Sequence, residues 1–400
     1  MRVAVIGGGI QGTCVALELA TRGIAVDLIE ANPTLMDEAS RHNEGKIHLG
    51  FVYANDPSFR TAELMFRGAS QFAPLMRRWL GRALDALPLS TPFNYVVHKD
   101  SLLSTTQLEE AYKEIAKRMR SVTSDGSYFG VEEPYVFTRQ DGSDPRYRAV
   151  DAVFTTQEIA VNPGLLADLI SKTVADVEGI RILAGTRVTA VAPSRRMVEA
   201  HLADGTALAL GPYDHVVNCS WRGRPAIDAT AGLALMTPWT FRMKYFLLAG
   251  GSPTVPSIPS TTIVLGGFGD VVDYGTGEFY LCWYPSGRLG WSSDLTPPQW
   301  PTRPDPSDAI VIARNTLTSL ASVVPGVEVL MAHRLEGSDV RGGVIFSLGD
   351  TDIDDPDSRF HKRSEVGLRS QGQYHSVDTG KYTTAPLFAL EAADRITGMS

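Results

Sequence analysis

The sequence is poor in cysteine, with only Cys14, Cys219 and Cys282 among 400 residues. They are far apart, odd in number and without the spacing of a metal site, so we expect reduced thiols and a cytoplasmic location. No apolar run approaches the ~20 residues that a membrane span requires. A strand pattern that starts at residue 2 leaves no room for a signal peptide, so we expect neither a membrane span nor secretion.

Long stretches of like charge are also missing. The chain has 37 Lys and Arg residues against 45 Asp and Glu residues, a formal net charge of −8. Without a basic block, a nucleic-acid partner is not expected, although a local cationic pocket for a small anionic molecule stays compatible with this balance. The length exceeds what one hydrophobic core usually supports, so we expect two domains. The sequence does not indicate an oligomeric state.

Glycine, in contrast, is concentrated at the N-terminus, in "MRVAVIGGGIQGTCVALELA". The pattern predicts a buried strand, a turn and a helix, with Gly7, Gly9 and Gly12 in the spacing Gly-x-Gly-x-x-Gly. Such a turn directs backbone N–H groups and the positive end of a helix at a pyrophosphate. A second strand, "IAVDLIEA", ends at Glu30, about 20 residues after the motif, where a carboxylate accepts hydrogen bonds from a ribose. The pattern predicts a dinucleotide site and leaves FAD and NAD open.

Two amphipathic helices follow the dinucleotide motif. One is expected at 57–80 and the other at 107–120, because apolar residues recur there every three or four positions. Thr106 and Glu109 predict a capping box for the second of these helices. Asn162 and Pro163 predict the start of another helix.

The order of motifs along the chain resembles that of the D-amino-acid oxidase superfamily of FAD-dependent oxidoreductases, which includes sarcosine and glycine oxidases. The matching stretches are the N-terminal fingerprint, "VNPGLLADLISKT…ILAGTRVTAV", "YDHVVNCS" and the terminal "GKYTTAPLFALEAADRI". The resemblance implies FAD rather than NAD. Beyond the fingerprint, the cofactor contacts that it implies are those of Val188, Ser220, Gly380, Lys381, Tyr382 and Thr383.

The same resemblance implies a fold that combines α/β and α+β parts. A Rossmann-like FAD-binding domain, discontinuous in sequence, would comprise 1–85, 150–225 and 330–400. A second, antiparallel-sheet substrate domain would comprise 86–149 and 226–329, where aromatic strands alternate with proline-rich joints.

A second, local resemblance lies in "SRHNEGKIHLG", residues 40–50. It is similar to a stretch of L-2-hydroxyglutarate dehydrogenase-like members and also matches a sarcosine oxidase pattern. Either comparison implies that the segment runs under the flavin ring; the alternative is a polar surface loop. His42 is placed much like the flavin-linked histidine of dimethylglycine dehydrogenase-like relatives, but Asn43 and Glu44 depart from that pattern, so we expect non-covalent FAD. The residues of this segment expected to touch the cofactor are Ser40, Arg41, Asn43, Gly45 and Lys46.

The candidate catalytic residues are His48, Lys46, Arg242, Tyr284 and Arg288. His48 is the candidate base because the unperturbed pKa of imidazole lies near neutrality; the alternative is a histidine packed in the core. Arg242 and Lys244 lie two apart on a predicted strand, hence on one face, where they could bind an anionic substrate. Tyr284 would wall the pocket. Arg288 stands in "YPSGRLGWSS" where sarcosine oxidases have a lysine that promotes reaction with oxygen, so the electron acceptor stays open.

Together these features predict an FAD-dependent enzyme that oxidises a CH–N bond of a small amine or amino-acid-like substrate by hydride transfer to flavin N5. The alternative is oxidation of CH–OH in a 2-hydroxy acid, which the 43–50 match favours. A flavin monooxygenase is a weaker alternative because an acidic loop, not a helix, follows Gly349 and Asp350. A non-catalytic FAD-binding subunit is the remaining alternative. No metal is expected.

Overall fold

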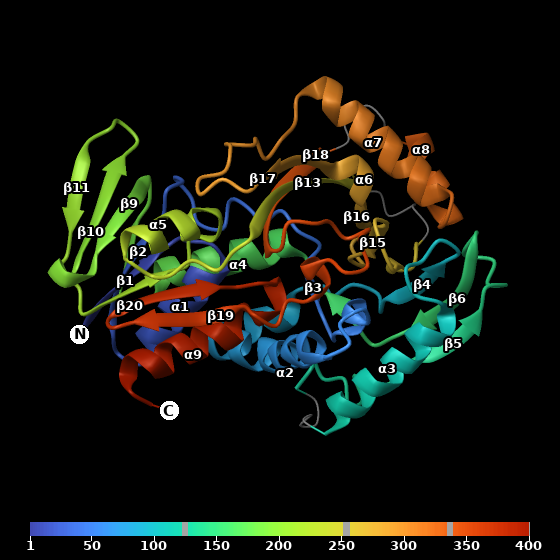
Figure 1. The fold of residues 1–400 in the computed structure, drawn as a ribbon, viewed down its shortest axis with the longest axis horizontal. Helices are drawn as coiled ribbons and strands as arrows, with labels where there is room; N and C mark the ends of the chain where they lie inside the picture. Colours follow the sequence, from blue (N-terminus) through green and yellow to red (C-terminus); the bar gives the residue numbers. More distant parts are fainter. Residues whose placement is uncertain (122–126, 251–256, 334–338, 400) are drawn as a thin grey trace.

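The computed structural model describes residues 1–121, 127–250, 257–333 and 339–399. Two large β-sheets lie along the long axis of the molecule, and helices lie against both of them (Figure 1). The chain crosses repeatedly between the two sheets, so each sheet is built from segments that are distant in sequence. None of the helices in this part of the chain is long and apolar enough to cross a membrane.

The first sheet has six strands in the order β19-β20-β12-β1-β2-β8. All run parallel except the edge strand β19, which pairs antiparallel with β20. Strands β1 and β2 are buried beyond their first residue, as expected for parallel strands that helices cover. The strands are β1 (Arg2–Ile6), β2 (Ala25–Ile29), β8 (Ile180–Leu183), β12 (His215–Asn218), β19 (Gly367–Gln371) and β20 (Tyr374–Asp378). The helices in contact with them are α1 (Ile10–Thr21), α4 (Pro163–Asp176), α5 (Arg224–Thr230) and α9 (Ala385–Thr397).

The second sheet has nine strands in the order β17-β13-β16-β15-β14-β4-β6-β5, with β18 also paired to β13. Its neighbours are antiparallel except for the parallel pair β14 and β4. Helix α7 (Pro306–Ala321) contacts β13, β15 and β16. The strands are β4 (Asn94–His98), β5 (Thr138–Asp141), β6 (Val150–Thr155), β13 (Trp239–Gly250), β14 (Thr261–Val264), β15 (Gly269–Asp273), β16 (Glu278–Trp283), β17 (Arg288–Ser292) and β18 (Asp339–Leu348).

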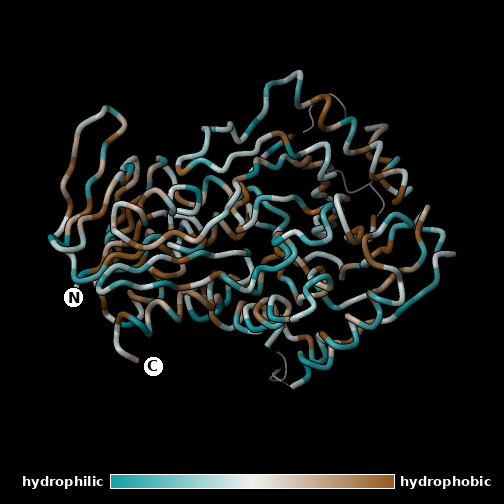
Figure 2. The backbone as a smooth tube through the Cα atoms, in the orientation of Figure 1, coloured by the Kyte–Doolittle hydropathy of each residue, from teal (hydrophilic) through white to brown (hydrophobic). Residues whose placement is uncertain are grey.

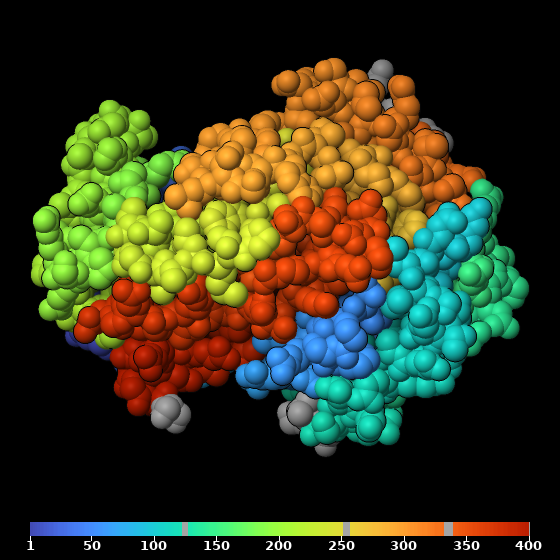
Figure 3. Space-filling view, in the orientation of Figure 1, coloured from blue at the N-terminus to red at the C-terminus, as the bar shows by residue number. Residues whose placement is uncertain are grey.

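The remaining elements are smaller. Strands β3 (Lys46–Ile47) and β7 (Ile159–Ala160) form a two-stranded ladder, and the other short sheet contains β9 (Thr186–Ala192), β10 (Met197–Leu202) and β11 (Ala207–Leu210). The remaining α-helices among the described residues are α2 (Arg60–Leu80), α3 (Thr105–Arg120), α6 (Tyr284–Gly287) and α8 (Glu328–His333). In the space-filling view the C-terminal part of the chain, orange-red to red, lies between β9–β11 at one end and β4–β6 at the other (Figure 3).

The expected fold class is confirmed: a Rossmann-like parallel sheet is joined to a second, mostly antiparallel sheet. Two strands that fall within the expected FAD-binding ranges belong instead to the second sheet. β6 pairs with β4 and β5, and β18 pairs with β13 along almost its whole length, so both belong to the nine-stranded sheet. The division into two domains stays a proposal, and residues 122–126, 251–256, 334–338 and 400 of the expected ranges lie outside the described residues.

One hydrophobic core joins the two sheets. It contains Val3 and Val5 of β1 together with Tyr95, Val272 and Tyr280 of the nine-stranded sheet, all of them buried. Figure 2 shows the same arrangement, with brown apolar segments concentrated inside and teal polar segments around them. Because protein interiors are close-packed, this shared core fixes the position of one sheet relative to the other.

The expected helices at 57–80 and 107–120 are present as α2 and α3, but the predicted cap of α3 is wrong by two residues. Ser104 is the N-cap residue, with an extended backbone, and Gln107 completes the capping box. Thr106 already lies inside the helix, so its hydroxyl is not at the cap position. The prediction for α4 is confirmed, because the Asn162 side chain accepts hydrogen bonds from the N–H groups of Gly164 and Leu165.

We expect Ser104→Ala to lower the free energy of unfolding by about 1 kcal/mol, the usual loss when a capping hydroxyl is removed. The reason is that the N–H of Gln107 loses its acceptor at 3.3 Å. Urea denaturation of the two variants and the parent measures the effect. Thr106→Ala is the matched control and should change the value by less than about 0.5 kcal/mol. A larger loss in Thr106→Ala than in Ser104→Ala would contradict the observed cap.

Candidate functional site

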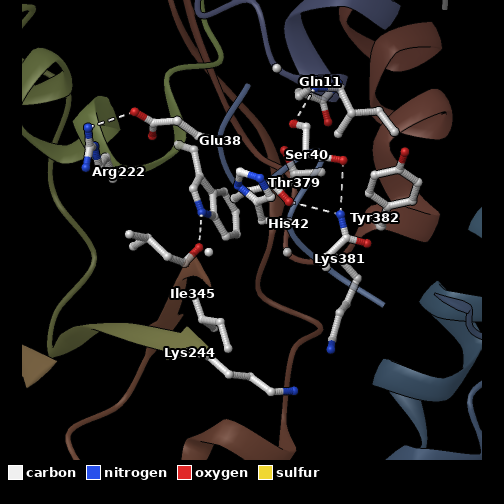
Figure 4. Close-up of a pocket in the computed structure, with 18 of the residues that line it drawn as sticks. Gln11, Glu38, Ser40, His42, Arg222, Lys244, Ile345, Thr379, Lys381 and Tyr382 are labelled. Carbon is white, nitrogen blue, oxygen red and sulfur yellow. Dashed lines mark hydrogen bonds and ion pairs between the residues drawn. The ribbon is translucent and has the colours of Figure 1, made fainter. Parts of the chain in front are cut away.

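A cavity of about 570 Å³ opens at the carboxyl ends of the parallel strands and extends to the face of the nine-stranded sheet. Residues after β1, β2, β12 and β20 line one side, and residues of β13, β14, β15 and β16 line the other. Open α/β sheets bind their ligands at the carboxyl ends of the strands. Figure 4 shows the side chains of Lys244 and Lys381 directed into the same space.

The glycine turn between β1 and α1 is tightly packed. Gly7 has a φ of +97°, and a Cβ atom there would lie 2.8 Å from the carbonyl oxygen of Cys219. A Cβ atom on Gly12 would lie 1.8 Å from the carbonyl oxygen of Gly7, so only glycine lets α1 approach the turn this closely. Gly9 is the N-cap of α1 and lines the cavity, which leaves room beside the positive end of the helix.

Two side chains complete this end of the cavity. The Ser40 hydroxyl accepts a hydrogen bond from the N–H of Ile10 at 2.8 Å, at the start of α1. The Glu30 carboxylate, at the end of β2, accepts from the N–H groups of Gly8 at 2.6 Å and Asn32 at 2.7 Å. Burial raises the pKa of Glu30 above its ordinary value. The fingerprint and its acidic residue therefore lie together, as the spacing predicts for a dinucleotide site, and Ser40 lies beside them.

The 40–50 segment follows the wall of the cavity and is held by its own polar side chains. Asn43 accepts from the N–H of Gly45 and donates to the carbonyl groups of Ala39 and Ser40. Gly45 has a φ of +69°, and a Cβ atom on it would lie 1.9 Å from the carbonyl oxygen of Val161. The short β3–β7 ladder therefore requires glycine at this position.

The C-terminal turn is bonded to the same segment. The Thr383 hydroxyl accepts from the N–H of His48 at 2.9 Å and donates to the carbonyl of Lys46 at 3.2 Å. Thr383 was expected to touch the cofactor, but it is not among the residues that line the cavity; its partners are backbone groups of β3 and His48. It therefore fixes the backbone on which Lys46 and His48 are carried.

Lys46 is a buried ammonium group between the two sheets. Its Nζ donates to the Asp270 carboxylate at 2.8 Å and to the Thr262 hydroxyl at 2.5 Å, and it lies 4.4 Å from the centre of the Phe93 ring. Burial lowers the pKa of Lys46, but Asp270, Glu158 and Glu44 raise it above its ordinary value. The ammonium group therefore stays charged and points toward β14 and β15.

His48 lies in the cavity wall between two carboxylates. Its Nδ1 is 3.5 Å from Oε1 of Glu158, and its Nε2 is 3.8 Å from Oε1 of Glu44. Both ring nitrogens are buried and without a hydrogen-bond partner among the described residues. Burial lowers the pKa of His48 more than Glu158 raises it, so the imidazole is neutral at neutral pH and can accept a proton.

Cations gather beyond His48. Burial raises the pKa of Glu44, but Lys381 and Lys244 lower it to about 2, so this carboxylate is ionised. Burial lowers the pKa of Lys381 to about 8, and Arg363 and Lys244 act in the same direction against the attraction of Glu44. Arg363 lines the cavity and donates to the carbonyl groups of Phe346 and Gly380, but it forms no ion pair with a described carboxylate.

Arg242 is placed differently from Lys244. Its guanidinium has no exposed surface and lies 4.3 Å and 4.1 Å from the ring centres of Trp291 and Phe360. It donates to the Ser347 hydroxyl at 2.6 Å and to the Thr351 carbonyl at 2.7 Å. Because its hydrogen bonds go to protein groups outside the cavity lining, Arg242 is not well placed to bind substrate.

Tyr284 and Arg288 meet at one carboxylate. The Tyr284 hydroxyl donates to Asp352 at 2.8 Å, and Nε of Arg288 lies 3.1 Å from the same carboxylate. Tyr284 lines the cavity, as expected, whereas Arg288 is 38% exposed and does not. The pair therefore anchors the acidic loop after β18 beside the cavity.

The sequence-predicted residues thus divide into two groups. Those that line the cavity are Gly7, Gly9, Glu30, Ser40, Asn43, Lys46, His48, Val188, Ser220, Tyr284, Gly380, Lys381 and Tyr382. Those that do not are Gly12, Arg41, Gly45, Arg242, Arg288 and Thr383. Arg41 instead pairs with Asp168 at 2.5 Å. The roles assigned to all of these residues stay predictions.

The cavity is chemically suited to a large polar cofactor. Five of its lining residues, Gln11, His42, His48, Tyr53 and Tyr382, have buried side-chain polar atoms without a hydrogen-bond partner among the described residues. Buried polar groups are normally hydrogen-bonded, so this concentration is typical of a ligand site. With the glycine turn for a pyrophosphate and Glu30 for a ribose, the residues fit FAD.

The fold and the cavity together define a flavin-type dinucleotide-binding protein of the α/β class. The family model described as FAD dependent oxidoreductase (DAO) matches residues 2–352. The chain belongs to this family, whose members are FAD-dependent enzymes, and its cofactor is FAD. A sequence search of the curated proteins finds no match.

Solved structures agree on the fold. Glycine oxidase from Geobacillus kaustophilus has a TM-score of 0.71 at 14% identity, covering 100% of this chain and 95% of that one. Iminodiacetate oxidase from Chelativorans sp. BNC1 has a TM-score of 0.66 at 16% identity, covering 100% and 96%. L-alpha-glycerophosphate oxidase from Mycoplasma pneumoniae, with FAD bound, has a TM-score of 0.62 at 15% identity, covering 99% and 94%.

Several charged residues at the site were missed from the sequence. Glu44, Glu158, Asp270 and Arg363 lie on four different elements or loops that only the tertiary fold brings together. One signal was available: Glu44 and His48 are four residues apart in "EGKIH". Another was Glu158, a single acid before the apolar strand "IAV".

We expect the FAD to be released when the protein is precipitated with acid, leaving a colourless pellet. His42 lines the cavity, and burial together with Arg341 lowers its pKa to about 4, so its ring is neutral. Because the "HNEG" stretch departs from the pattern of flavin-linked relatives, we expect no bond to His42. Mass spectrometry of the supernatant should identify FAD; flavin fluorescence that stays with the polypeptide in parent but not in His42→Ala would contradict the prediction.

Proposed function

We propose that this protein oxidises a CH–N bond of a small amine or amino-acid-like substrate, with His48 as the proton acceptor. The observation that carries the proposal is the position of His48 in the cavity wall, with a carboxylate within 4 Å of each ring nitrogen and no hydrogen-bond partner for either nitrogen among the described residues. Bound FAD supplies hydride acceptance at its N5 atom. The chain must then take up one proton from the substrate amine, and His48 is the group available to do so.

Glu44 supports an amine substrate. Its carboxylate lines the cavity, is ionised, and lies within 4 Å of His48 Nε2. A protonated amine is attracted to a carboxylate in a site of low dielectric constant, and a neutral alcohol much less so. Two of the similar structures, the glycine and iminodiacetate oxidases, are named for substrates with CH–N bonds, which agrees with this choice.

An anionic group on the substrate is the second part of the proposal. Arg363 is buried, lines the cavity and has no carboxylate partner among the described residues. A buried charge without a partner is costly, so an anionic ligand would offset that cost. Lys244 acts on the same part of the cavity, because Lys244 and Arg363 both lower the pKa of Lys381. We assign the anionic group to Arg363 and Lys244 rather than to Arg242.

Oxidation of CH–OH in a 2-hydroxy acid is the second candidate. The same histidine can accept the hydroxyl proton, and the same cations can bind the carboxylate. The similar glycerophosphate oxidase, named for an alcohol substrate, favours this candidate.

We expect amino acids to reduce the flavin of the FAD-loaded protein under anaerobic conditions, seen as loss of its absorbance band. Each amino acid is compared with its decarboxylated amine and with the 2-hydroxy acid of the same carbon skeleton. The amino acid should react about 10- to 100-fold faster than the decarboxylated amine, because one charge-assisted interaction is missing from the latter. Faster reduction by the hydroxy acids would favour the second candidate, and no reduction by any compound would contradict both.

We expect His48→Asn to lower the rate of anaerobic flavin reduction by about 10²–10⁴-fold, the range for a positioned acid–base group. Stopped-flow mixing of fully FAD-loaded variant and parent measures the rate per bound flavin. His361→Asn is a matched control, because His361 also lines the cavity but its Nε2–H donates a hydrogen bond to the carbonyl of Asp355, at 3.0 Å. An unchanged rate in His48→Asn, with only the melting temperature lowered, would remove His48 from the chemistry.

A further inference from the structure

A carboxylate with no exposed surface lies directly behind His48. Glu158 Oε1 accepts a hydrogen bond from the Tyr95 hydroxyl at 2.5 Å, and Oε2 accepts from the N–H of Leu49 at 2.6 Å. The third neighbour is His48, whose Nδ1 lies 3.5 Å from Oε1. Glu158 does not line the cavity, so it reaches the substrate side only through His48.

The buried Glu158 carboxylate can stay ionised only if hydrogen-bond donors and positive charges stabilise it. Burial raises the pKa of Glu158, but His48, Lys46 and Tyr95 lower it below its ordinary value. A buried charge is tolerated only when it is paired and hydrogen-bonded. Glu158 receives the Tyr95 O–H and the Leu49 N–H, and Nδ1 of His48 lies 3.5 Å from its Oε1. The surroundings therefore hold a negative charge at a defined distance from one ring nitrogen.

We propose that Glu158 is the positioning residue of His48. It accepts the Nδ1–H of the imidazole and so leaves Nε2, on the side of Glu44 and the cavity, as the proton acceptor. The inference rests on the proposed function, in which His48 takes the substrate proton. In that step the substrate N–H bond breaks and an Nε2–H bond forms, while the hydride from the adjacent carbon leaves to bound FAD.

The charges around His48 suit this role. When Nε2 gains a proton, the imidazolium lies between the Glu158 and Glu44 carboxylates, which are already charged and need not reorganise. Lys46 and Lys381 oppose the imidazolium, and the Tyr53 ring meets the imidazole edge-on at 6.0 Å between ring centres. Without the charge of Glu158, Glu44 is the carboxylate left within 4 Å of the ring, and Nε2–H toward Glu44 becomes the favoured tautomer.

The kinetic test is Glu158→Gln in the FAD-loaded protein, which keeps the shape of the side chain and removes its charge. We expect the rate of anaerobic flavin reduction to fall about 10- to 100-fold, by analogy with the loss seen when the carboxylate that orients a metal-bound histidine is removed. The kinetic pKa of the base should move to lower pH, because the carboxylate that favours the imidazolium is gone. Glu158→Asp keeps the charge and should recover part of the rate. Equal rates and equal pH profiles for Glu158→Gln and parent would overturn the proposal.

Tyr112→Phe is the matched structural control. Tyr112 is buried beside Tyr95, with 6.0 Å between the two ring centres, and its hydroxyl has no hydrogen-bond partner among the described residues. Its pH profile should match that of the parent. If Glu158→Gln lowered only the melting temperature, and left the pH profile as in Tyr112→Phe, Glu158 would be structural and the proposal wrong.

A measurement without turnover separates this inference from the proposed function. The ¹⁵N chemical shifts of the His48 ring, assigned with His48→Asn, report which nitrogen carries the proton. We expect Nδ1–H in the parent and a shift toward Nε2–H in Glu158→Gln. The same tautomer in both proteins would overturn the positioning role. If parent and Glu158→Gln had different tautomers but no amine reduced the bound flavin, the Glu158–His48 coupling would be supported and the proposed function contradicted.

Discussion

The buried ion pair between Lys46 and Asp270 is the interaction on which the site depends. It ties the 40–50 segment, which enters from the glycine-rich side, to β15 of the nine-stranded sheet. Removing one partner of such a pair leaves an uncompensated buried charge and costs about 3–5 kcal/mol, whereas replacing both by apolar residues can be neutral. The contribution of the Lys46–Asp270 pair to the site is therefore to fix the position of the 40–50 segment. His48 follows two residues later, Thr383 is hydrogen-bonded to the backbone of both residues, and the His48 ring lies in the wall of the cavity.

Features that depend on neighbouring residues could be predicted from the sequence. The glycine turn and Glu30 are in place because β1, α1 and β2 form one local unit with short-range packing. The cap of α4 was predictable for the same reason. The cap of α3 was missed by two residues because Ser104 and Thr106 carry the same hydroxyl chemistry, and only the extended backbone at Ser104 decides between them.

The charged part of the site could not be predicted in the same way. Spacing placed Arg242 beside Lys244, but its neighbours Trp291 and Phe360 come from distant segments and enclose the guanidinium away from the cavity. Conversely, nothing local marks Arg363 as a cavity residue, because its position in the cavity wall depends on where β18 and the C-terminal turn meet. Tertiary packing decides which of several arginines has no carboxylate partner among the described residues, and the sequence pattern contains no measure of that packing.

The distribution of charge in the cavity constrains how a substrate can lie in it. Lys381 is 4.0 Å from the ionised Glu44, so an anionic group approaching Lys381 meets the repulsion of that carboxylate. Arg363 has no such neighbour among the described carboxylates, and its guanidinium can present paired donors to a carboxylate. We infer that an anionic group would point toward Arg363 and away from Glu44. The nitrogen of an amino-acid-like substrate would then lie toward Glu44 and Nε2 of His48, where the carboxylate attracts the amine and the imidazole can take its proton.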